Sequence, residues 1–564
     1  TINRTAPGQC RTMPPPKKPE PAATGRARTL ALEELRLSEA APTSIVEFVS
    51  RGRCLIIGSE EQVLAFAKQL PDSLTVVIAI PGSGKARPHR IEGFLAVRGG
   101  SVSIAGALGH FQVTVDSGDE RVELGALIAQ PGQLTDLIVD LNARPLLRRG
   151  LLPLGYYPAG PDPAAWRETL SLLPEMRGEF EKPKFYNYDP EICAHGASGK
   201  RGCNRCVEAC PAEAIVSIGE KVEVNPYLCQ GGGACATACP TGAMTYAYPR
   251  PGDLLSALRK ALMTFREAAG SSPCLLFHDA NDQPAAIERL NSDLPDEILP
   301  IAVEDVGSLG METWLACLAY GADAVMILTT DATPAQVVET TQEQLITVRP
   351  ILAGLGFDEA SVQLLNADQS NATRQALSER PRSPLTTPAR FAAPAKDKRG
   401  TLRLALNHLA TAATELDESV ALQQGAPFGE VRVDGAACTL CMSCVSVCPT
   451  HALQDGRGEP QLRFREWNCV QCGLCERACP ESAIDLRARY LYDSDAREQP
   501  RLLHEEPAFC CVSCGKPFAT RSMLEKLERK LEGHWMFQSD AQRRRIQMCE
   551  DCRVKDVLEA SLQK

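Results

Sequence analysis

The chain has 564 residues, a formal net charge of −10, 44% hydrophobic residues and 23% charged residues. One hydrophobic core rarely serves a chain of this length, so several domains are expected. The acidic balance argues against a nucleic-acid partner, because phosphate backbones are bound by basic faces, and no run approaches the roughly eighteen apolar residues of a membrane-spanning helix.

The first part of the chain predicts a tail followed by an α/β domain. Residues 1–42 are rich in Pro, Lys and Arg without an apolar h-region, so we expect a disordered tail on a cytoplasmic protein. In the domain over 43–165, RCLIIGS and LTVVIAI predict buried strands, and EEQVLAFAKQL predicts a helix between them. The turn GSEEQ lacks the G-x-G-x-x-G fingerprint, and PGSGKARPHR lacks the full phosphate-loop spacing and is interpreted as a solvated turn.

Two cysteine-rich units follow, separated by a second α/β domain. The first cysteine-rich unit covers 183–250 and the second covers 427–490, and in the first the run AIVSIGEKVEV predicts a hairpin between two cysteine loops. Over 251–372, CLLFHD, ILPIAV and DAVMILTT predict strands, and PAAIERL and METWLACLAYG predict helices. A linker and helix over 373–426 and a separate module over 500–564 complete the chain.

The cysteines of the second unit follow one spacing twice. Each run has the form C-x2-C-x2-C-x3-C-P, in which three thiolates bind one 4Fe-4S cluster and the fourth binds the other cluster. Disulfides would need an oxidising compartment, and zinc knuckles use neither the third cysteine nor the trailing proline. The predicted ligand sets are Cys438, Cys441, Cys444 and Cys479 for one cluster, and Cys469, Cys472, Cys475 and Cys448 for the other.

The first unit is an altered copy of the second. Cys193 precedes the insertion CAHGASGKRGC, and a loop closes over this length at little extra entropic cost. The predicted ligands of a third 4Fe-4S cluster are therefore Cys193, Cys203, Cys206 and Cys239. His195 in the same insertion is interpreted as a surface or hydrogen-bonding residue.

One position of the first unit has lost its cysteine. Gly232 stands where the middle cysteine of the run should be, so that Cys210, Cys229 and Cys235 remain. The pattern C-x5-C-x3-C-P resembles the run that binds the 3Fe-4S cluster in the iron–sulfur subunits of succinate dehydrogenase and fumarate reductase. We therefore predict a 3Fe-4S cluster. A 4Fe-4S cluster with one non-cysteine ligand and a half-site without a cluster are the alternatives.

The C-terminal module contains two C-x2-C pairs. Four thiolates, from Cys511, Cys514, Cys549 and Cys552, suit a tetrahedral zinc ion that would give a small module its core. The sequence CVSCGKPF resembles a zinc ribbon, and a rubredoxin-like iron site stays open as the alternative. Cys510 is interpreted as an incidental extra. Between the pairs, MLEKLERKLEG predicts a helix docked by an apolar stripe.

The second α/β domain carries a family resemblance of its own. The runs GSLGMETWLACLAYGADAVMIL and EQLITVRPILAGLGF resemble the delta-subunit domain that links hydrogenases to heterodisulfide reductases. That resemblance implies a 2Fe-2S cluster, but the corresponding places here hold His278 and Asp305, with Cys274 and Cys317 nearby, so we expect the fold without the cluster. Cys317 lies on the apolar face of a predicted helix and is interpreted as a core residue.

The ordered set of two ferredoxin-like domains, the delta-like domain and the terminal CVSCGKPF…MCEDC module resembles a proteobacterial family of multi-cluster 4Fe-4S proteins associated with molybdenum- or tungsten-dependent formate dehydrogenases. The resemblance implies a multidomain α+β and α/β protein. Because the sequence has no G-x-S-x-G elbow and no H-E-x-x-H helix, the leading hypothesis is a non-catalytic electron-transfer subunit that relays single electrons between a redox enzyme and an acceptor. A flavin- or nicotinamide-linked subunit using the N-terminal domain, and a maturation or docking factor, are the alternatives.

Overall fold

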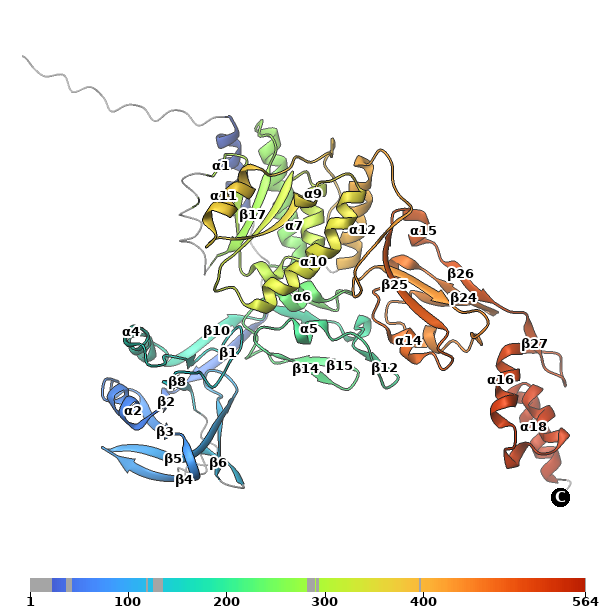
Figure 1. Ribbon diagram of the computed structural model, residues 1–564, viewed down its shortest axis with the longest axis horizontal. Coiled ribbons are helices and arrows are strands. Elements are labelled where there is room, and N and C mark those ends of the chain that lie inside the picture. Colours follow the sequence, from blue (N-terminus) through green and yellow to red (C-terminus); the bar gives the residue numbers. More distant parts are fainter. Residues whose placement is uncertain are drawn as a thin grey trace, which may run out of the picture.

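The computed structural model describes residues 23–36, 43–117, 120–124, 135–280, 290, 294–394 and 397–562. In Figure 1 the N-terminal α/β domain, the two cysteine-rich units and the C-terminal module follow one another from lower left to lower right. The second α/β domain lies above the first cysteine-rich unit. Among the described helices, none combines the length and the apolar character needed to cross a bilayer.

The N-terminal α/β domain is built on one mixed sheet. Its parallel centre pairs β2 (Arg53–Ile57) with β3 (Thr75–Ile80) and β8 (Leu137–Asp140), and α2 (Glu60–Ala67) connects β2 to β3, as the sequence predicts. β2 and β8 are continuous apolar runs because both faces of the sheet are covered. The sheet order is β7-β6-β5-β3-β2-β8-β9, with β4 paired to β5. The outer strands are β4 (Gly82–Ile91), β5 (Phe94–Ala105), β6 (Gln112–Ser117), β7 (Glu120–Glu123) and β9 (Tyr156–Tyr157).

Two expectations for this region are wrong. Most of PGSGKARPHR forms β4, antiparallel to β5, and its mostly exposed side chains left no apolar alternation to indicate a strand. The tail expected over 1–42 contains the helix α1 (Ala23–Arg36), which packs on α7 (Pro251–Glu267) through the fully buried Ala27 and Ala31. The rest of that segment lies outside the described residues.

The first cysteine-rich unit consists of two cysteine loops, each followed by a short helix. The predicted hairpin is β14 (Ile215–Ile218) with β15 (Lys221–Val224), and β11 (Tyr186–Tyr188) pairs with β16 (Met244–Tyr246). The helices are α5 (Arg205–Glu208) and α6 (Ala234–Ala238). The insertion after Cys193 forms its own small hairpin, β12 (Gly196–Ala197) with β13 (Lys200–Arg201). Upstream, α4 (Pro163–Leu172) precedes β10 (Gly178–Pro183), which pairs with β1 (Ile45–Ser50) and so ties this unit to the N-terminal domain.

The second α/β domain has a four-stranded parallel sheet in the order β18-β17-β19-β20. The strands β17 (Cys274–Asp279), β18 (Ile298–Val303) and β19 (Ala324–Thr329) and the helix α9 (Met311–Ala319) are as predicted, and β20 (Val362–Asn366), α10 (Ala335–Gly354) and α11 (Ser370–Ser378) complete the domain. Apart from Leu290, the helix predicted for PAAIERL lies outside the described residues. Cys317 is fully buried in the core, which confirms its interpretation.

The remaining elements belong to the linker, the second cysteine-rich unit and the C-terminal module. The linker contains α12 (Lys398–Leu409) and β21 (Ser419–Ala421). The second unit contains β22 (Gly429–Val433), α13 (Ser443–Ser446), β23 (Leu453–Gly456), β24 (Glu459–Phe464), α14 (Leu474–Ala478) and β25 (Ile484–Leu491), followed by α15 (Ser494–Glu498) and β26 (Arg501–Glu505). The C-terminal module is a β27 (Ala508–Cys510) and β28 (Pro517–Thr520) hairpin with α16 (Arg521–Leu531), α17 (Asp540–Arg544) and α18 (Glu550–Leu562), so that the predicted helix is present.

One apolar cluster connects the second α/β domain to both cysteine-rich units. Around the fully buried Trp314 of α9, the cluster includes Ala234 and Ala238 from the first unit and Trp467 and Tyr490 from the second. The cysteine-rich units are therefore packed on a common core, which fixes their distance from each other.

Lys398, at the start of α12, ties the first unit to this core by polar contacts. Its ammonium group donates to the carbonyls of Ala236 (2.9 Å) and Thr237 (2.8 Å) in α6. It also lies 3.5 Å from the Glu312 carboxylate, and these two side chains are 8% and 9% exposed. The ion pair is thus largely removed from water.

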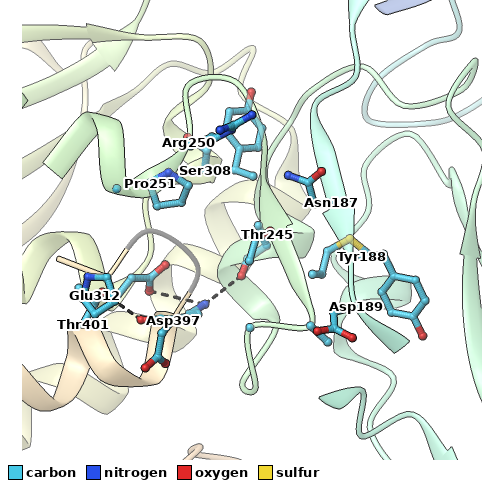
Figure 2. A pocket seen from close by; sticks show the side chains of 18 of the residues that line it. Asn187, Tyr188, Asp189, Thr245, Arg250, Pro251, Ser308, Glu312, Asp397 and Thr401 are labelled. Atoms are coloured by element: carbon cyan, nitrogen blue, oxygen red, sulfur yellow. Dashed lines mark hydrogen bonds and ion pairs between the residues drawn. The ribbon is translucent and has the colours of Figure 1, made fainter. Parts of the chain in front are cut away.

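A cavity of about 340 Å³ opens beside this ion pair. It lies between the β11–β16 strands of the first unit and the first turns of α7 and α12, and its polar lining includes Asn187, Asp189 and Arg250 (Figure 2).

We expect Lys398→Met to destabilise the protein by about 3–5 kcal/mol, because Glu312 would stay buried without its cation. Lys68→Met is the matched control, because it breaks the ion pair between Lys68 and Glu92. These two side chains are 56% and 49% exposed. That change should cost less than about 1 kcal/mol. Denaturant unfolding of the anaerobic holoprotein measures the loss of stability in both variants. Equal losses would contradict the stabilising role of the buried Lys398–Glu312 ion pair.

Candidate iron–sulfur and metal sites

Both cysteine-rich units present backbone N–H groups to sulfur in the same way. After each Cys-Pro pair the chain turns back, and an N–H group four or five residues beyond the cysteine donates to its thiol. The four bonds, each 3.3 Å long, run from Ala214 to Cys210, Met244 to Cys239, Ala452 to Cys448 and Ala483 to Cys479. Such donors stabilise the thiolate, the form that binds iron, so the loops fit an iron–sulfur core.

The structure brings together the two cysteine sets assigned in the second unit. Burial, and then the charges of its three partners, raise the pKa of Cys444 to about 12, and the partners are Cys438, Cys441 and Cys479. The same two causes raise the pKa of Cys475, whose partners are Cys469, Cys472 and Cys448. Cys444 also contributes to this rise, so the two sets are neighbours.

The four-cysteine set assigned in the first unit is also assembled. Burial, followed by the charges of Cys239, Cys203 and Cys193, raises the pKa of Cys206. Cys193 therefore reaches the site across its long insertion. His195 is buried rather than exposed, and its ring nitrogens contact the Cys203 carbonyl (2.8 Å) and the Ser217 hydroxyl (2.7 Å). Both ring nitrogens are thus engaged in hydrogen bonds, as expected for a hydrogen-bonding residue.

The three-cysteine set lies next to that site. Burial, followed by the charges of Cys229 and Cys210, raises the pKa of Cys235 well above its ordinary value, with smaller contributions from Cys206 and Cys239. Its loop packs closely against the second α/β domain. Gly233 in this loop adopts φ +64°, and a β-carbon there would lie 2.4 Å from the Ser308 nitrogen. Glycine is therefore required for this close approach.

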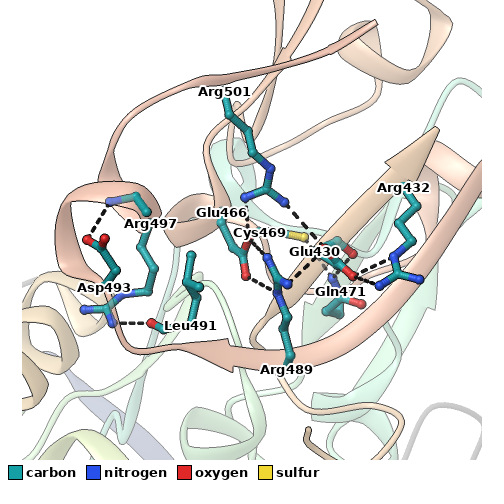
Figure 3. Close-up of polar contacts among 11 residues, drawn as sticks. Glu430, Arg432, Glu466, Cys469, Gln471, Arg489, Leu491, Asp493, Arg497 and Arg501 are labelled. Atoms are coloured by element: carbon teal, nitrogen blue, oxygen red, sulfur yellow. Dashed lines mark hydrogen bonds and ion pairs between the residues drawn. The ribbon is translucent and has the colours of Figure 1, made fainter. Parts of the chain in front are cut away.

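An arginine–glutamate network borders the Cys469 set (Figure 3). The buried Glu466 accepts two hydrogen bonds from Arg489, both 2.9 Å long, and one of 2.5 Å from Arg501. Burial acts to raise the pKa of Glu466, but these arginines outweigh it and hold that pKa below its ordinary value of 4.5. Arg489 also contacts Glu430 at 3.1 Å.

The network reaches a cysteine through Gln471. The Gln471 amide donates to the Cys469 thiol and to the Glu430 carbonyl, both at 3.3 Å. Gln471 thus connects the backbone of Glu430 to this cysteine set, and the charges of the network lie close to it.

The two units meet at the Cys203 and Cys472 loops. Burial raises the pKa of Cys472 to about 11. The backbone N–H of Leu474 opposes this rise, and the charges of Cys448 and Cys203 add to it. Cys203 belongs to the other unit, so the neighbouring sets of the two units approach each other closely. A β-carbon on Gly202 would lie 2.8 Å from the Leu474 side chain, and glycine is what allows this contact.

Arg477 bridges the same junction, and Arg205 binds the linker that leads into the second unit. The Arg477 guanidinium, on α14, donates to the carbonyls of Arg201 and Gly202. From the first unit, Arg205 donates to the Gly425 carbonyl. The four cysteine sets therefore form one series in space, from Cys229 through Cys203 and Cys472 to Cys444.

The C-terminal module holds a four-cysteine site. The thiols of Cys511, Cys514, Cys549 and Cys552 all lie within 4.8 Å of one another, as a tetrahedral metal ion requires. Burial acts to raise the pKa of Cys511, but backbone N–H groups of Cys514, Cys549 and Ser513 outweigh it and lower that pKa to about 6. The donor set therefore fits a metal ion. Cys510 lies outside the group and is exposed.

The module is attached to the outermost cysteine set of the second unit. The Thr520 hydroxyl donates to the carbonyl of Thr439, which stands between two cysteines of that set, at 3.0 Å. Lys526 forms an ion pair with Glu481, two residues after Cys479.

Comparison with known families agrees with this geometry. Residues 437–484 match a family model described as a 4Fe-4S dicluster domain, and residues 200–243 match a second model with the same description. No curated protein matches the chain. The chain contains two 4Fe-4S dicluster ferredoxin domains, here ferredoxin domains 1 and 2, and these support an iron–sulfur electron-transfer role. The range matched in domain 1 begins after Cys193.

Sequence reasoning missed the groups that surround the cysteines. Glu466, Arg489 and Arg501 carry no recognisable motif and come from three different elements. Arg205 and Arg477 lie inside the cysteine runs, but their acceptors are carbonyls of another part of the chain. No local pattern identifies such partners, whereas the spacing of the cysteines is local and identified the sets.

We expect Glu466→Gln to lower the free energy of unfolding by about 1.5–3 kcal/mol, since two buried charge-assisted contacts are weakened. Because the pKa of Glu466 is depressed in the folded state, this difference should hold above pH 4.5 and shrink as the pH falls below it. Removing a negative charge should also raise the reduction potential of the cluster at Cys469. The control is Glu459→Gln, which changes an exposed residue of the same domain. EPR-monitored redox titration measures the reduction potential of the cluster in both variants. An equal shift of potential in the control would contradict a specific effect of Glu466.

For the C-terminal site, we expect Cys549→Ser to abolish metal binding and to expose α16 to rapid hydrogen exchange, because the metal supplies most of the module's stability. Cys510→Ser should leave both properties unchanged. Metal analysis combined with hydrogen-exchange mass spectrometry distinguishes the two variants. Retention of the metal and of α16 protection in the Cys549 variant would show that this residue is not a ligand.

Proposed function

We propose that this chain is an iron–sulfur electron-transfer subunit that relays single electrons through four clusters. The proposal is supported above all by the junction at which Gly202, beside Cys203 of ferredoxin domain 1, packs against Leu474 near Cys472 of ferredoxin domain 2, and at which Arg477 donates to the carbonyls of Arg201 and Gly202. Without that contact the domains would be two separate carriers on one chain. With it, the cysteine sets form one series from the N-terminal side of the molecule to the C-terminal module.

The proposed cofactors follow the cysteine sets. Three sets of four thiols would each hold a 4Fe-4S cluster, and the set of Cys210, Cys229 and Cys235 would hold a 3Fe-4S cluster. These clusters supply the one-electron redox chemistry. The chain itself fixes their separation, shields most of the thiolates partly or fully from water, and supplies N–H donors and charges that set their potentials. At the C-terminal module we propose zinc, which has no redox step and suits a structural site.

We further propose that a molybdenum- or tungsten-dependent formate dehydrogenase is the redox partner, in the cytoplasm. The family resemblance of the ordered domains supports this assignment. In the test, anaerobic holoprotein is mixed with such an enzyme and formate, and bleaching of the cluster absorbance is followed. Reduction by formate with the enzyme, and none without it, is expected. Reduction by dithionite but not by the enzyme with formate would reject this partner and leave the relay standing.

The relay itself is tested at the junction. In Arg205→Ala/Arg477→Ala, the contact of Arg477 across the junction and the contact of Arg205 with the linker are lost, each contributing about 1 kcal/mol at an exposed position. We expect all cluster EPR signals to persist while electrons redistribute more slowly between the domains after partial reduction, measured by rapid-freeze EPR. Arg487→Ala, which breaks an exposed ion pair within ferredoxin domain 2, is the control and should redistribute at the wild-type rate. Unchanged redistribution in the double variant would contradict the role of the junction.

A further inference from the structure

Gly232 stands where the three-cysteine site lacks a fourth thiol. A β-carbon built on this glycine would lie 2.9 Å from Leu151 Cδ1, 3.1 Å from Pro211 Cγ and 3.7 Å from Asp305 Oδ2. A regular run would have its middle cysteine here, reaching toward the cluster. Leu151 and Pro211 leave little room for that side chain and offer no donor atom. Of the three nearest groups, Asp305 is the one that can bind a metal.

The fold holds the Asp305 carboxylate in this place. Asp305 caps the single-turn helix over Val306–Ser308, and its Oδ1 accepts a 2.7 Å hydrogen bond from the Gly307 N–H. A β-carbon on Gly307 would lie 2.4 Å from the Gly232 carbonyl oxygen, so the capped turn and the glycine loop are in direct contact. The cap holds the Asp305 side chain in one orientation. Its second carboxylate oxygen therefore stays next to Gly232.

Negative charges predominate around this part of the three-cysteine site, where a cation, the Lys182 ammonium, donates to the Cys229 carbonyl at 2.7 Å. The Tyr246 hydroxyl donates to the Gly231 carbonyl at 2.8 Å. Burial, followed by the charges of Asp305, Glu304, Cys229 and Cys235, raises the pKa of this hydroxyl. Carboxylates and thiolates therefore share one partly buried space, which is unfavourable unless cations lie between them.

We propose that Asp305 is the ligand of a fourth, exchangeable iron at the three-cysteine site. The inference rests on the proposed 3Fe-4S cluster and names a metal site on it. Ferrous iron adds to the reduced, neutral three-iron core to give the dicationic four-iron core, with an electron pair of Asp305 Oδ2 forming the new Fe–O bond. No electron moves in this step, and the electron that first reduces the core comes from the relay. Loss of ferrous iron reverses it, because a carboxylate holds iron less firmly than a thiolate.

The test follows iron uptake by EPR and iron analysis. Oxidised wild-type holoprotein should show a three-iron signal. After anaerobic reduction, addition of ferrous iron, removal of unbound iron and mild reoxidation, the three-iron signal should not return, because the dicationic four-iron core gives no EPR signal, and iron analysis should find one further iron bound per chain. Asp305→Asn keeps the oxygen that caps Gly307 and should show the same three-iron signal when oxidised, with uptake at least about tenfold weaker. Asp305→Cys should hold four irons without added iron.

Glu304→Gln is the matched control, since Glu304 is the neighbouring carboxylate, and it should take up iron as the wild type does. A wild-type three-iron signal that returns at full intensity on this reoxidation, with no further iron bound, would overturn the proposal, as would uptake by Asp305→Asn equal to wild type. Loss of uptake in Glu304→Gln would overturn the assignment to Asp305. Absence of a three-iron signal from every oxidised variant would instead overturn the three-iron cluster on which the inference rests.

Discussion

The rest of this structure depends on thiol groups that are buried beside other thiol groups. In each of the four cysteine sets, burial raises the pKa of a central thiol and the charges of its partners raise it further, as for Cys206, Cys235, Cys444 and Cys475. Such sets are stable as thiolates when iron lies between them and backbone N–H groups point at sulfur. Each of the four tight loops after the Cys-Pro pairs supplies one backbone N–H donor to a cysteine sulfur.

A series of clusters carries electrons usefully when the distances between them are fixed, and most of the remaining chain fixes them. The second α/β domain contributes the shared apolar core on which both ferredoxin domains pack. Lys398 fastens domain 1 to that core, Arg477 fastens the two domains to each other, and Arg205 fastens domain 1 to the linker that leads into domain 2. The C-terminal module is placed against the outermost cysteine set by Thr520 and Lys526. Consistent with this scaffold role, Cys274 and Cys317 of the α/β domain are fully buried core residues.

The sequence determined the composition of the sites far better than their surroundings. Cysteine spacing is a local signal, so it identified the four sets and the C-terminal group, including Cys193 across a long insertion. Continuous apolar runs likewise predicted the buried strands β2, β17 and β19. By contrast, α1 owes its place to two alanines packed on a helix far along the chain, and β4 is a mostly exposed strand without an apolar pattern. The junction arginines bind distant backbone and Asp305 lies beside Gly232 of another domain, and both arrangements become visible once the chain is folded.

Magnetic coupling between the ferredoxin domains tests the continuous relay most directly. In the fully reduced holoprotein, the clusters at Cys203 and Cys472 should interact, because their cysteine sets are close enough to be electrostatic neighbours. The EPR spectrum should then be broadened and should relax faster than the sum of spectra recorded with one domain reduced at a time. A spectrum equal to that sum would show that the two domains are magnetically separate, and the relay through the junction would be wrong.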